Sequence, residues 1–249
     1  KDITDSIHYA QRIQRAILPS DEYVRELFPS SFIFFQPRDV VSGDFYWTSK
    51  HKNTSIIAVV DCTGHGVPGA FMSMIGNSLL NQIVNEQGIT KPAEILFKLR
   101  EEVIKALKQT GAIGESRDGM DIAICCIENK KLQFAGANNP LIFIRNNQLT
   151  EYKGDKQPIG IYSGTPKPFT NHEIDLQTGD CIYLYSDGYA DQFGGHQNKK
   201  FKYAQLKELL TTIVQLPMER QREKLQLNFE AWKSDNEQVD DVLVIGIRT

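Results

Sequence analysis

The hydrophobic residues change their spacing along the chain, and each change predicts a different kind of element. Over residues 3–17 the apolar side chains recur every three or four positions, which is the spacing of one helix face. That face consists of Ile3, Ile7, Ala10, Ile13 and Ile17. Pro19, Ser20 and Asp21 then interrupt the pattern, and a second short helix is predicted over 21–28.

Short apolar runs of strand length follow, separated by polar or glycine-containing turns. Residues 31–36, 44–48 and 55–60 are such runs, and their spacing predicts an antiparallel meander. Two long helices are predicted next, over about 68–86 and 92–109, with Pro92 in a first turn that tolerates proline. The later elements are strands at 121–127, 131–136, 140–145 and 180–186, a Gly/Pro/Lys-rich loop at 153–168, helices at about 202–214 and 217–232, and a strand at 241–247.

This order of elements favours one class of fold. Strands come in runs and helices in pairs, without the strict alternation of a doubly wound parallel sheet. We therefore expect an α+β protein in which helices are layered on antiparallel sheets. The predicted domains are a helical linker over residues 1–19 and a single large domain over 20–249.

Composition narrows the possible partners. The net charge is 28 − 31 = −3 and no dense basic stripe occurs, so nucleic acid is not an expected partner. No apolar run approaches the roughly 20 residues of a membrane span. The chain has neither an initiating Met nor a signal peptide, so we expect a cytoplasmic piece of a longer protein without membrane contact of its own. Cys62, Cys125, Cys126 and Cys181 lack metal-ligand spacing, which predicts reduced, buried thiols and no zinc.

Acidic residues stand at the edges of the predicted buried strands. They are Asp44, Asp61, Asp187, Asp240 and Asp241. Aspartate at a strand edge can simply cap a turn, above all beside glycine. If these edges meet, however, the carboxylates repel one another unless cations neutralise them. Oxygen ligands of this type suit Mg²⁺ or Mn²⁺.

The segment DCTGHGVPGAF joins one of these aspartates to a predicted helix. Gly64, Gly66 and Gly69 allow a sharp backbone turn between Asp61 and the helix. The segment lacks the lysine of a Walker phosphate loop, and no G-x-S-x-G nucleophile elbow occurs in the chain. The chemistry of the site is thus expected to depend on carboxylates rather than on a covalent nucleophile.

Seven segments in order resemble one known family. They are PRDVVSGDFYW, VVDCTGHGVPGAFMSMIGNSLLNQIV, DGMDIAICCIE, FAGANNPLIFIR, QPIG, YSDGYADQFGG and DDVLVIGI, between about residues 37 and 247. Together they resemble the bacterial SpoIIE-like branch of the PPM (PP2C-type) metal-dependent serine/threonine phosphatases. The resemblance implies an αββα sandwich of two antiparallel sheets flanked by helices, preceded by the linker helix.

The same resemblance implies a metal site with two Mn²⁺ or Mg²⁺ ions and a possible third, weaker one. Asp44 and Asp61 would hold or bridge the ions with the backbone carbonyl of Cys62, and Asp187 and Asp240 would hold the second ion. Asp241 would support them. Asp118, or else Asp121, would hold the third ion. His65 is a candidate general acid or a loop-structuring histidine, and Arg38 is a candidate phosphate contact.

The predicted function is that of an output domain in bacterial signalling. The expected reaction is hydrolysis of phosphoserine or phosphothreonine, with a phosphorylated anti-sigma-factor antagonist as the substrate type. A catalytically silent pseudophosphatase and a hydrolase of small phosphoesters are the alternatives. The apolar face of residues 3–17 is expected either to pack on its own domain or to pair in a parallel homodimer that receives a signal from an upstream sensor.

Overall fold

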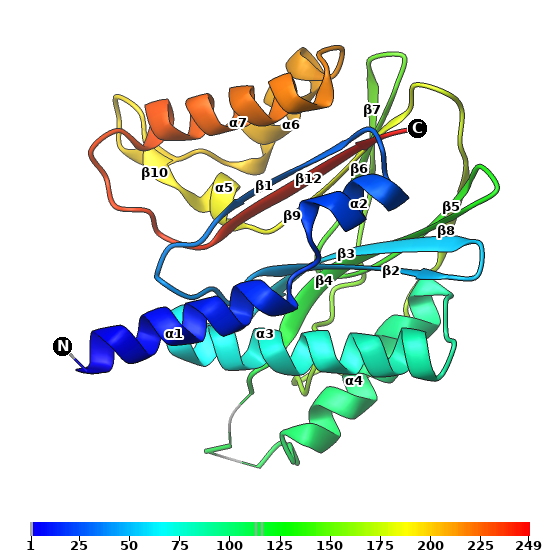
Figure 1. Cartoon of the computed structure of the whole chain (residues 1–249), viewed down its shortest axis with the longest axis vertical. Helices are drawn as coiled ribbons and strands as arrows, with labels where there is room; N and C mark the ends of the chain where they lie inside the picture. Colours follow the sequence, from blue (N-terminus) through cyan, green and yellow to red (C-terminus); the bar gives the residue numbers. More distant parts are fainter. Residues whose placement is uncertain (1, 113, 116) are drawn as a thin grey trace.

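Two five-stranded sheets packed face to face form the centre of the protein. The computed structural model describes residues 2–112, 114–115 and 117–249. One sheet has the order β1-β12-β9-β6-β7 and the other β2-β3-β4-β5-β8, and each pairing within them is antiparallel. In Figure 1, α3 and α4 cover the outer face of the second sheet, while α6 and α7 cover the first. The predicted α+β sandwich flanked by helices is confirmed.

The bounds of the elements follow the hydrophobic pattern closely. The strands of the sheets are β1 (Ser31–Gln36), β2 (Phe45–His51), β3 (Thr54–Cys62), β4 (Met120–Glu128), β5 (Lys131–Ala137), β6 (Leu141–Arg145), β7 (Gln148–Tyr152), β8 (His172–Asp175), β9 (Cys181–Tyr185) and β12 (Val242–Arg248). A small ribbon contains β10 (Phe193–Gly194) and β11 (Lys199–Lys200). The α-helices are α1 (Asp2–Ile17), α2 (Asp21–Leu27), α3 (Gly66–Leu80), α4 (Pro92–Ala106), α5 (Gly188–Asp191), α6 (Tyr203–Ile213) and α7 (Met218–Lys233).

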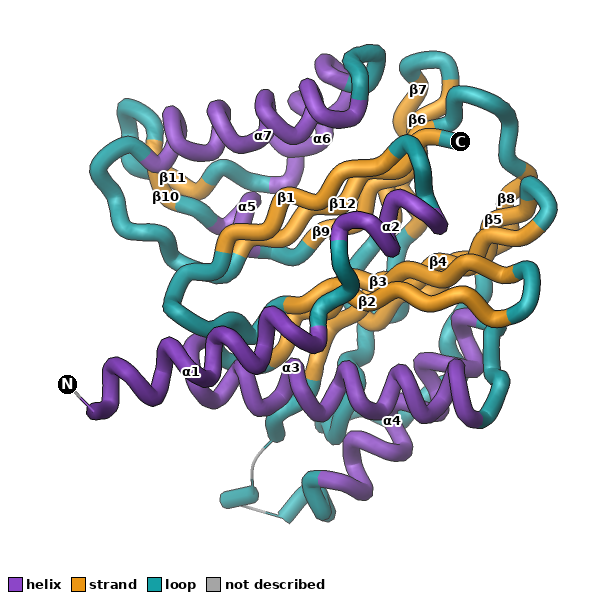
Figure 2. The backbone as a smooth tube through the Cα atoms, in the orientation of Figure 1, coloured by secondary structure: helices purple, strands orange, loops and turns teal. Residues whose placement is uncertain are grey.

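Strand β3 illustrates why the central strands are apolar at every position. Successive side chains of a strand point to opposite faces. Ile56, Ala58 and Val60 pack into the core beneath α3 and α4, whereas Ile57 and Val59 pack into the core between the two sheets. Both faces of β3 are therefore buried, and the strand ends with Asp61 at the edge of this buried layer. Figure 2 shows this layered arrangement, with helices outside and strands inside.

One expectation about the arrangement of elements is wrong. The strand at 31–36 does not join a meander with the next two strands; β1 pairs with β12, from Ser31 opposite Ile247 to Gln36 opposite Val242. The helix expected over 68–86 is present, but its winding changes along its length: it is α-helical over Gly66–Leu80 and π-helical over Asn81–Glu86. The sequence pattern also missed β7 and β8, whose strands are short and only partly buried.

The N-terminal helix packs on α3 through only part of the predicted apolar face. Gln14 is the buried residue of α1: its Nε2 donates to the Ser42 carbonyl (2.6 Å) and to Ser73 Oγ (2.9 Å). By contrast, Ile3 is 78% exposed and Ile13 is 41% exposed. The helix thus packs on its own domain, one of the two expected outcomes, but only Ile7 and Ile17 of the apolar face are partly buried there.

Two simpler expectations can be compared directly with the structure. All four cysteines are buried free thiols, as predicted. None of the helices among the described residues has the length and apolar character needed to cross a bilayer.

Candidate active site

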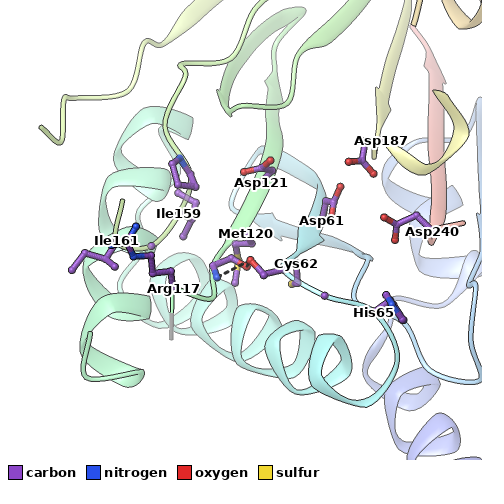
Figure 3. A pocket seen from close by; sticks show the side chains of 15 residues that line it. Asp61, Cys62, His65, Arg117, Met120, Asp121, Ile159, Ile161, Asp187 and Asp240 are labelled. Carbon is purple, nitrogen blue, oxygen red and sulfur yellow. Dashed lines mark hydrogen bonds between the residues drawn. The ribbon is translucent and has the colours of Figure 1, made fainter. Parts of the chain in front are cut away.

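Three of the four aspartates predicted to hold the two main ions line one cavity at an end of the sandwich. Asp61 is at the end of β3, Asp187 follows β9, and Asp240 precedes β12. Because β9 and β12 are antiparallel neighbours, the end of one strand lies beside the start of the other. The cavity has a volume of about 260 Å³. Figure 3 shows the three carboxylates pointing toward one another, with Asp121 nearby on β4, paired in register with Asp61.

Asp44 lies beneath this group and is almost completely buried. Asp44 is 2% exposed, and its Oδ2 has no hydrogen-bond partner among the residues that the structure describes. Burial raises the pKa of Asp44 well above its ordinary value, and the neighbouring carboxylate of Asp61 raises it further. A buried carboxylate oxygen without a partner is costly in an apolar interior. Asp44 is therefore an oxygen donor that a bound cation would satisfy.

The carboxylates on the cavity wall raise one another's pKa values. Burial is the largest cause of the raised pKa of Asp61, and the charges of Asp187 and Asp240 come next. Burial and the charge of Asp240 raise the pKa of Asp187 to about 6, and burial also raises the pKa of Asp240. Close like charges disfavour the ionised forms of all the members. A divalent cation would relieve this repulsion.

The turn after Asp61 depends on a close packing of three glycines. A Cβ on Gly69 would come 2.5 Å from the Gly64 carbonyl oxygen and 2.8 Å from the Gly43 Cα. A Cβ on Gly43 would come 2.4 Å from the same Gly64 oxygen. Gly64 itself has φ +81°, a backbone conformation that favours glycine. These contacts bring the segment before Asp44 against the loop after Asp61.

Asp241 supports the site by accepting hydrogen bonds from the backbone of the loop that contains Asp44. Its Oδ1 accepts from the backbone N–H of Arg38 (2.8 Å), and its Oδ2 accepts from the N–H of Gly43 (2.7 Å). A longer hydrogen bond joins Oδ2 to the N–H of Asp44 (3.4 Å). Asp241 is buried, and its carboxylate anchors the loop that carries Asp44.

His65 and Arg38, the two basic residues predicted to act on the phosphate ester, lie in different places. His65 lines the cavity, and its Nδ1 lies 2.8 Å from Asp39 Oδ2. Arg38 does not line the cavity; its Nη1 donates to the Val239 carbonyl oxygen (3.1 Å). The prediction that Arg38 contacts phosphate thus has no support in this arrangement.

The opposite wall contains residues for which the sequence predicted no individual role. Arg117 and the segment Pro158–Ile161 line the cavity across from His65 (Figure 3). Of the two candidates for a third ion, Asp121 lines the cavity. Asp118 does not; it is half-buried, and its carbonyl oxygen accepts from Gln109 Nε2 (2.6 Å). The pairing of β3 with β4 places Asp121 directly opposite Asp61, so Asp121 is better placed than Asp118 to bind a third ion.

The donor set fits a divalent cation that binds oxygen ligands. Among the described residues, no three acidic, imidazole or thiol side chains converge closely enough to hold an ion by themselves. Mg²⁺ does not need such a cage, since it usually keeps several waters and uses only one or two carboxylates. The partnerless Oδ2 of Asp44 and the repelling carboxylates beside it meet this requirement.

The fold and this acidic cavity define the class of the protein as a PP2C-type phosphatase domain. Over its whole length the chain is 32% identical to the SiaA PP2C domain of Pseudomonas aeruginosa, covering 100% of this chain and 97% of that one with a TM-score of 0.89. The SpoIIE phosphatase domain of Bacillus subtilis shares the fold, with a TM-score of 0.70 and 20% identity over 88% of this chain and 63% of that one.

The family is shown by the sequence itself. Residues 51–249 match the family described as Stage II sporulation protein E (SpoIIE), and the chain belongs to this family. A curated relative, phosphoserine phosphatase RsbU of Bacillus subtilis, is 27% identical over 195 residues, which are 77% of this chain. The chain spans about half of that relative's length (55%).

Proposed function

We propose that this chain is a metal-dependent protein phosphatase that hydrolyses phosphoserine or phosphothreonine. The observation that carries the proposal is the group of four carboxylates, Asp44, Asp61, Asp187 and Asp240, at one end of a PP2C-type sandwich. Phosphatases of this fold are metal-dependent, and the relative RsbU is a phosphoserine phosphatase. The absence of a nucleophile motif from the sequence agrees with direct attack by water.

Two Mn²⁺ or Mg²⁺ ions are the cofactors of this proposal. Asp44, Asp61 and the Cys62 carbonyl would hold one ion, and Asp187 with Asp240 the other. Asp121, which lines the cavity, or Asp118 would serve a third, weaker ion. When bound, such ions lower the pKa of water and neutralise phosphate oxygens.

The residues of the chain provide the rest of the site. The buried Asp241 holds the loop of Asp44 in place, and the glycine contacts fix the loop after Asp61. His65 on the cavity wall is the proposed general acid for the leaving serine or threonine oxygen. Arg117 and His65 are the residues with basic side chains among the described lining residues, and they would face an incoming phosphate from opposite walls.

The biological setting is proposed from the family. The substrate would be a phosphorylated protein of the anti-sigma-factor antagonist type, and the chain would be the cytoplasmic output domain of a protein with an upstream sensor. Residues 1–19 would be the linker and residues 20–249 the catalytic domain. The competing function is a pseudophosphatase that keeps the fold as a signalling module.

The substrate class can be tested by comparing two phosphoesters in the presence of Mn²⁺. We expect kcat/KM for a folded phosphoserine protein to exceed that for an aryl phosphate by at least about tenfold, because contacts remote from the phosphate contribute to binding. Equal efficiency on both would favour a small-molecule hydrolase. Stabilisation by Mn²⁺ without any hydrolysis would favour the pseudophosphatase.

We further propose that the chain forms a parallel homodimer through α1. Ile3 and Ile13 are exposed, and α3, on which α1 packs, also exposes Phe71. Changing both isoleucines to glutamate is expected to weaken dimerisation by at least about 100-fold, since burial of each isoleucine contributes about 1.5–3 kcal/mol. Analytical ultracentrifugation measures this, and Arg15→Ser on the exposed polar side of α1 is the control. A wild-type monomer at high concentration would contradict the proposal.

A further inference from the structure

Asp39 and His65 form a close pair at the edge of the cavity. Asp39 lies in the loop after β1, and His65 immediately precedes α3. The distance between His65 Nδ1 and Asp39 Oδ2 is 2.8 Å. An ionised carboxylate only accepts hydrogen bonds, so Nδ1 carries the hydrogen in this contact. The second ring nitrogen, Nε2, has no bond to Asp39 and belongs to a side chain that lines the cavity.

The position of Asp39 is itself fixed by neighbouring groups. The backbone N–H of Arg38 donates to Asp241 Oδ1 (2.8 Å), and Arg38 Nη1 donates to the Val239 carbonyl (3.1 Å). On the other side, a Cβ at Gly66 would lie 3.3 Å from Asp39 Oδ2. The carboxylate of Asp39 thus packs closely against the first residue of α3, where glycine leaves room for it.

We propose that Asp39 is the positioning residue of His65, an inference that rests on the proposed phosphatase function. Both side chains are about half exposed, and exposed ion pairs contribute little to stability. The contact orients the ring: in the proton-donating form, which carries a hydrogen on both nitrogens, Nδ1–H donates to Asp39 and Nε2–H is directed away from it. Loss of the Nε2 proton leaves the neutral Nδ1–H tautomer. Asp241 holds both this loop and Asp44, so it ties the position of the acid to the position of the carboxylates.

The role of the pair is to supply a proton to the leaving group. In the proposed reaction a water oxygen forms a bond to phosphorus while the bond from phosphorus to the serine oxygen breaks. The electron pair of the broken bond stays on the serine oxygen, which takes the proton of His65 Nε2. The proton lost by the water goes to solvent, and a solvent proton later restores His65. The products are inorganic phosphate and an unmodified serine.

The leaving group provides the first test. An alkoxide needs a proton, whereas p-nitrophenolate is a stable anion that leaves without one. We expect Asp39→Ala to lower kcat on a phosphoserine peptide by about 10- to 100-fold and His65→Ala by about 100-fold or more. On p-nitrophenyl phosphate the loss in kcat should be at least about tenfold smaller for each variant, because this leaving group needs no proton. Glu173→Gln, in an exposed ion pair with Lys131, is the matched control and should resemble wild type.

The double variant separates positioning from a general effect on the fold. If Asp39 acts through His65, then Asp39→Ala combined with His65→Ala should be no slower than His65→Ala alone. Asp39→Asn, whose amide oxygen still accepts from Nδ1–H, should recover part of the loss. Additive losses, or equal losses on both substrates, would overturn the inference.

A spectroscopic measurement tests the contact without relying on activity. Nitrogen-15 chemical shifts of the His65 ring, measured in the Mg²⁺-containing protein at a pH where the ring is neutral, should report the Nδ1–H tautomer in wild type and a shift toward the Nε2–H tautomer in Asp39→Ala. Unchanged ring shifts would overturn the inference even in an active enzyme. A wild-type protein with the expected shifts but no activity on any phosphoester would contradict the proposed function and leave the positioning contact established.

Discussion

Asp61→Asn is expected to lower kcat on a phosphoserine protein by at least about 1,000-fold in Mn²⁺, because divalent-ion stabilisation of developing charge is worth several kcal/mol. Asp61 lines the cavity, and its charge raises the pKa of the buried Asp44. The substitution keeps the size of the side chain and removes its charge. Phosphate release measures the loss, and Asp235→Asn, on an exposed aspartate, is the control.

The same variant should be more stable than wild type when no metal is bound. The folded pKa of Asp61 is raised, so its charge destabilises the fold at any pH above that value, and stability falls as pH rises from the unfolded pKa to the folded one. We expect the variant to have the higher Tm at neutral pH, with the difference shrinking as the pH is lowered. Mn²⁺ should raise the Tm of wild type and have much less effect on the variant. Full activity in Asp61→Asn would contradict the two-ion proposal.

Gly69→Ala is expected to destabilise the protein and to impair the active site together. The new Cβ would come 2.5 Å from the Gly64 carbonyl oxygen, so the backbone after Asp61 must move. Overpacking of this kind costs about 1–3 kcal/mol. A displacement of about 1 Å at the reacting groups can reduce turnover by about 100-fold.

Thermal unfolding and kcat measured on the same preparations test this expectation. Ser78→Ala is the control, because Ser78 lies on the exposed face of the same helix, α3. The control should keep both its Tm and its activity. If Gly69→Ala were as stable and as active as wild type, the close approach of the three glycine-containing segments would not be needed for the site.

Several features of the fold and site were predictable because their causes are local. The central strands have apolar residues at successive positions because both of their faces are buried, and β3 is the clearest case. Asp44, Asp61, Asp187 and Asp240 stand at the edges of these strands, so their grouping followed once the strand edges met. The class of fold and the expectation of oxygen ligands for a divalent cation therefore came from sequence.

Other features depend on contacts between segments that are far apart along the chain. The pairing of β1 with β12 joins residues about 200 positions apart, and no local pattern specifies such a partner. The same holds for the Asp39–His65 pair, for the hydrogen bonds of Asp241 to the loop of Asp44, and for the choice of Gln14 over the isoleucines as the buried residue of α1. Hydrophobic periodicity determines which face of an element can be buried, but the register and packing of the assembled sheets decide which polar groups meet.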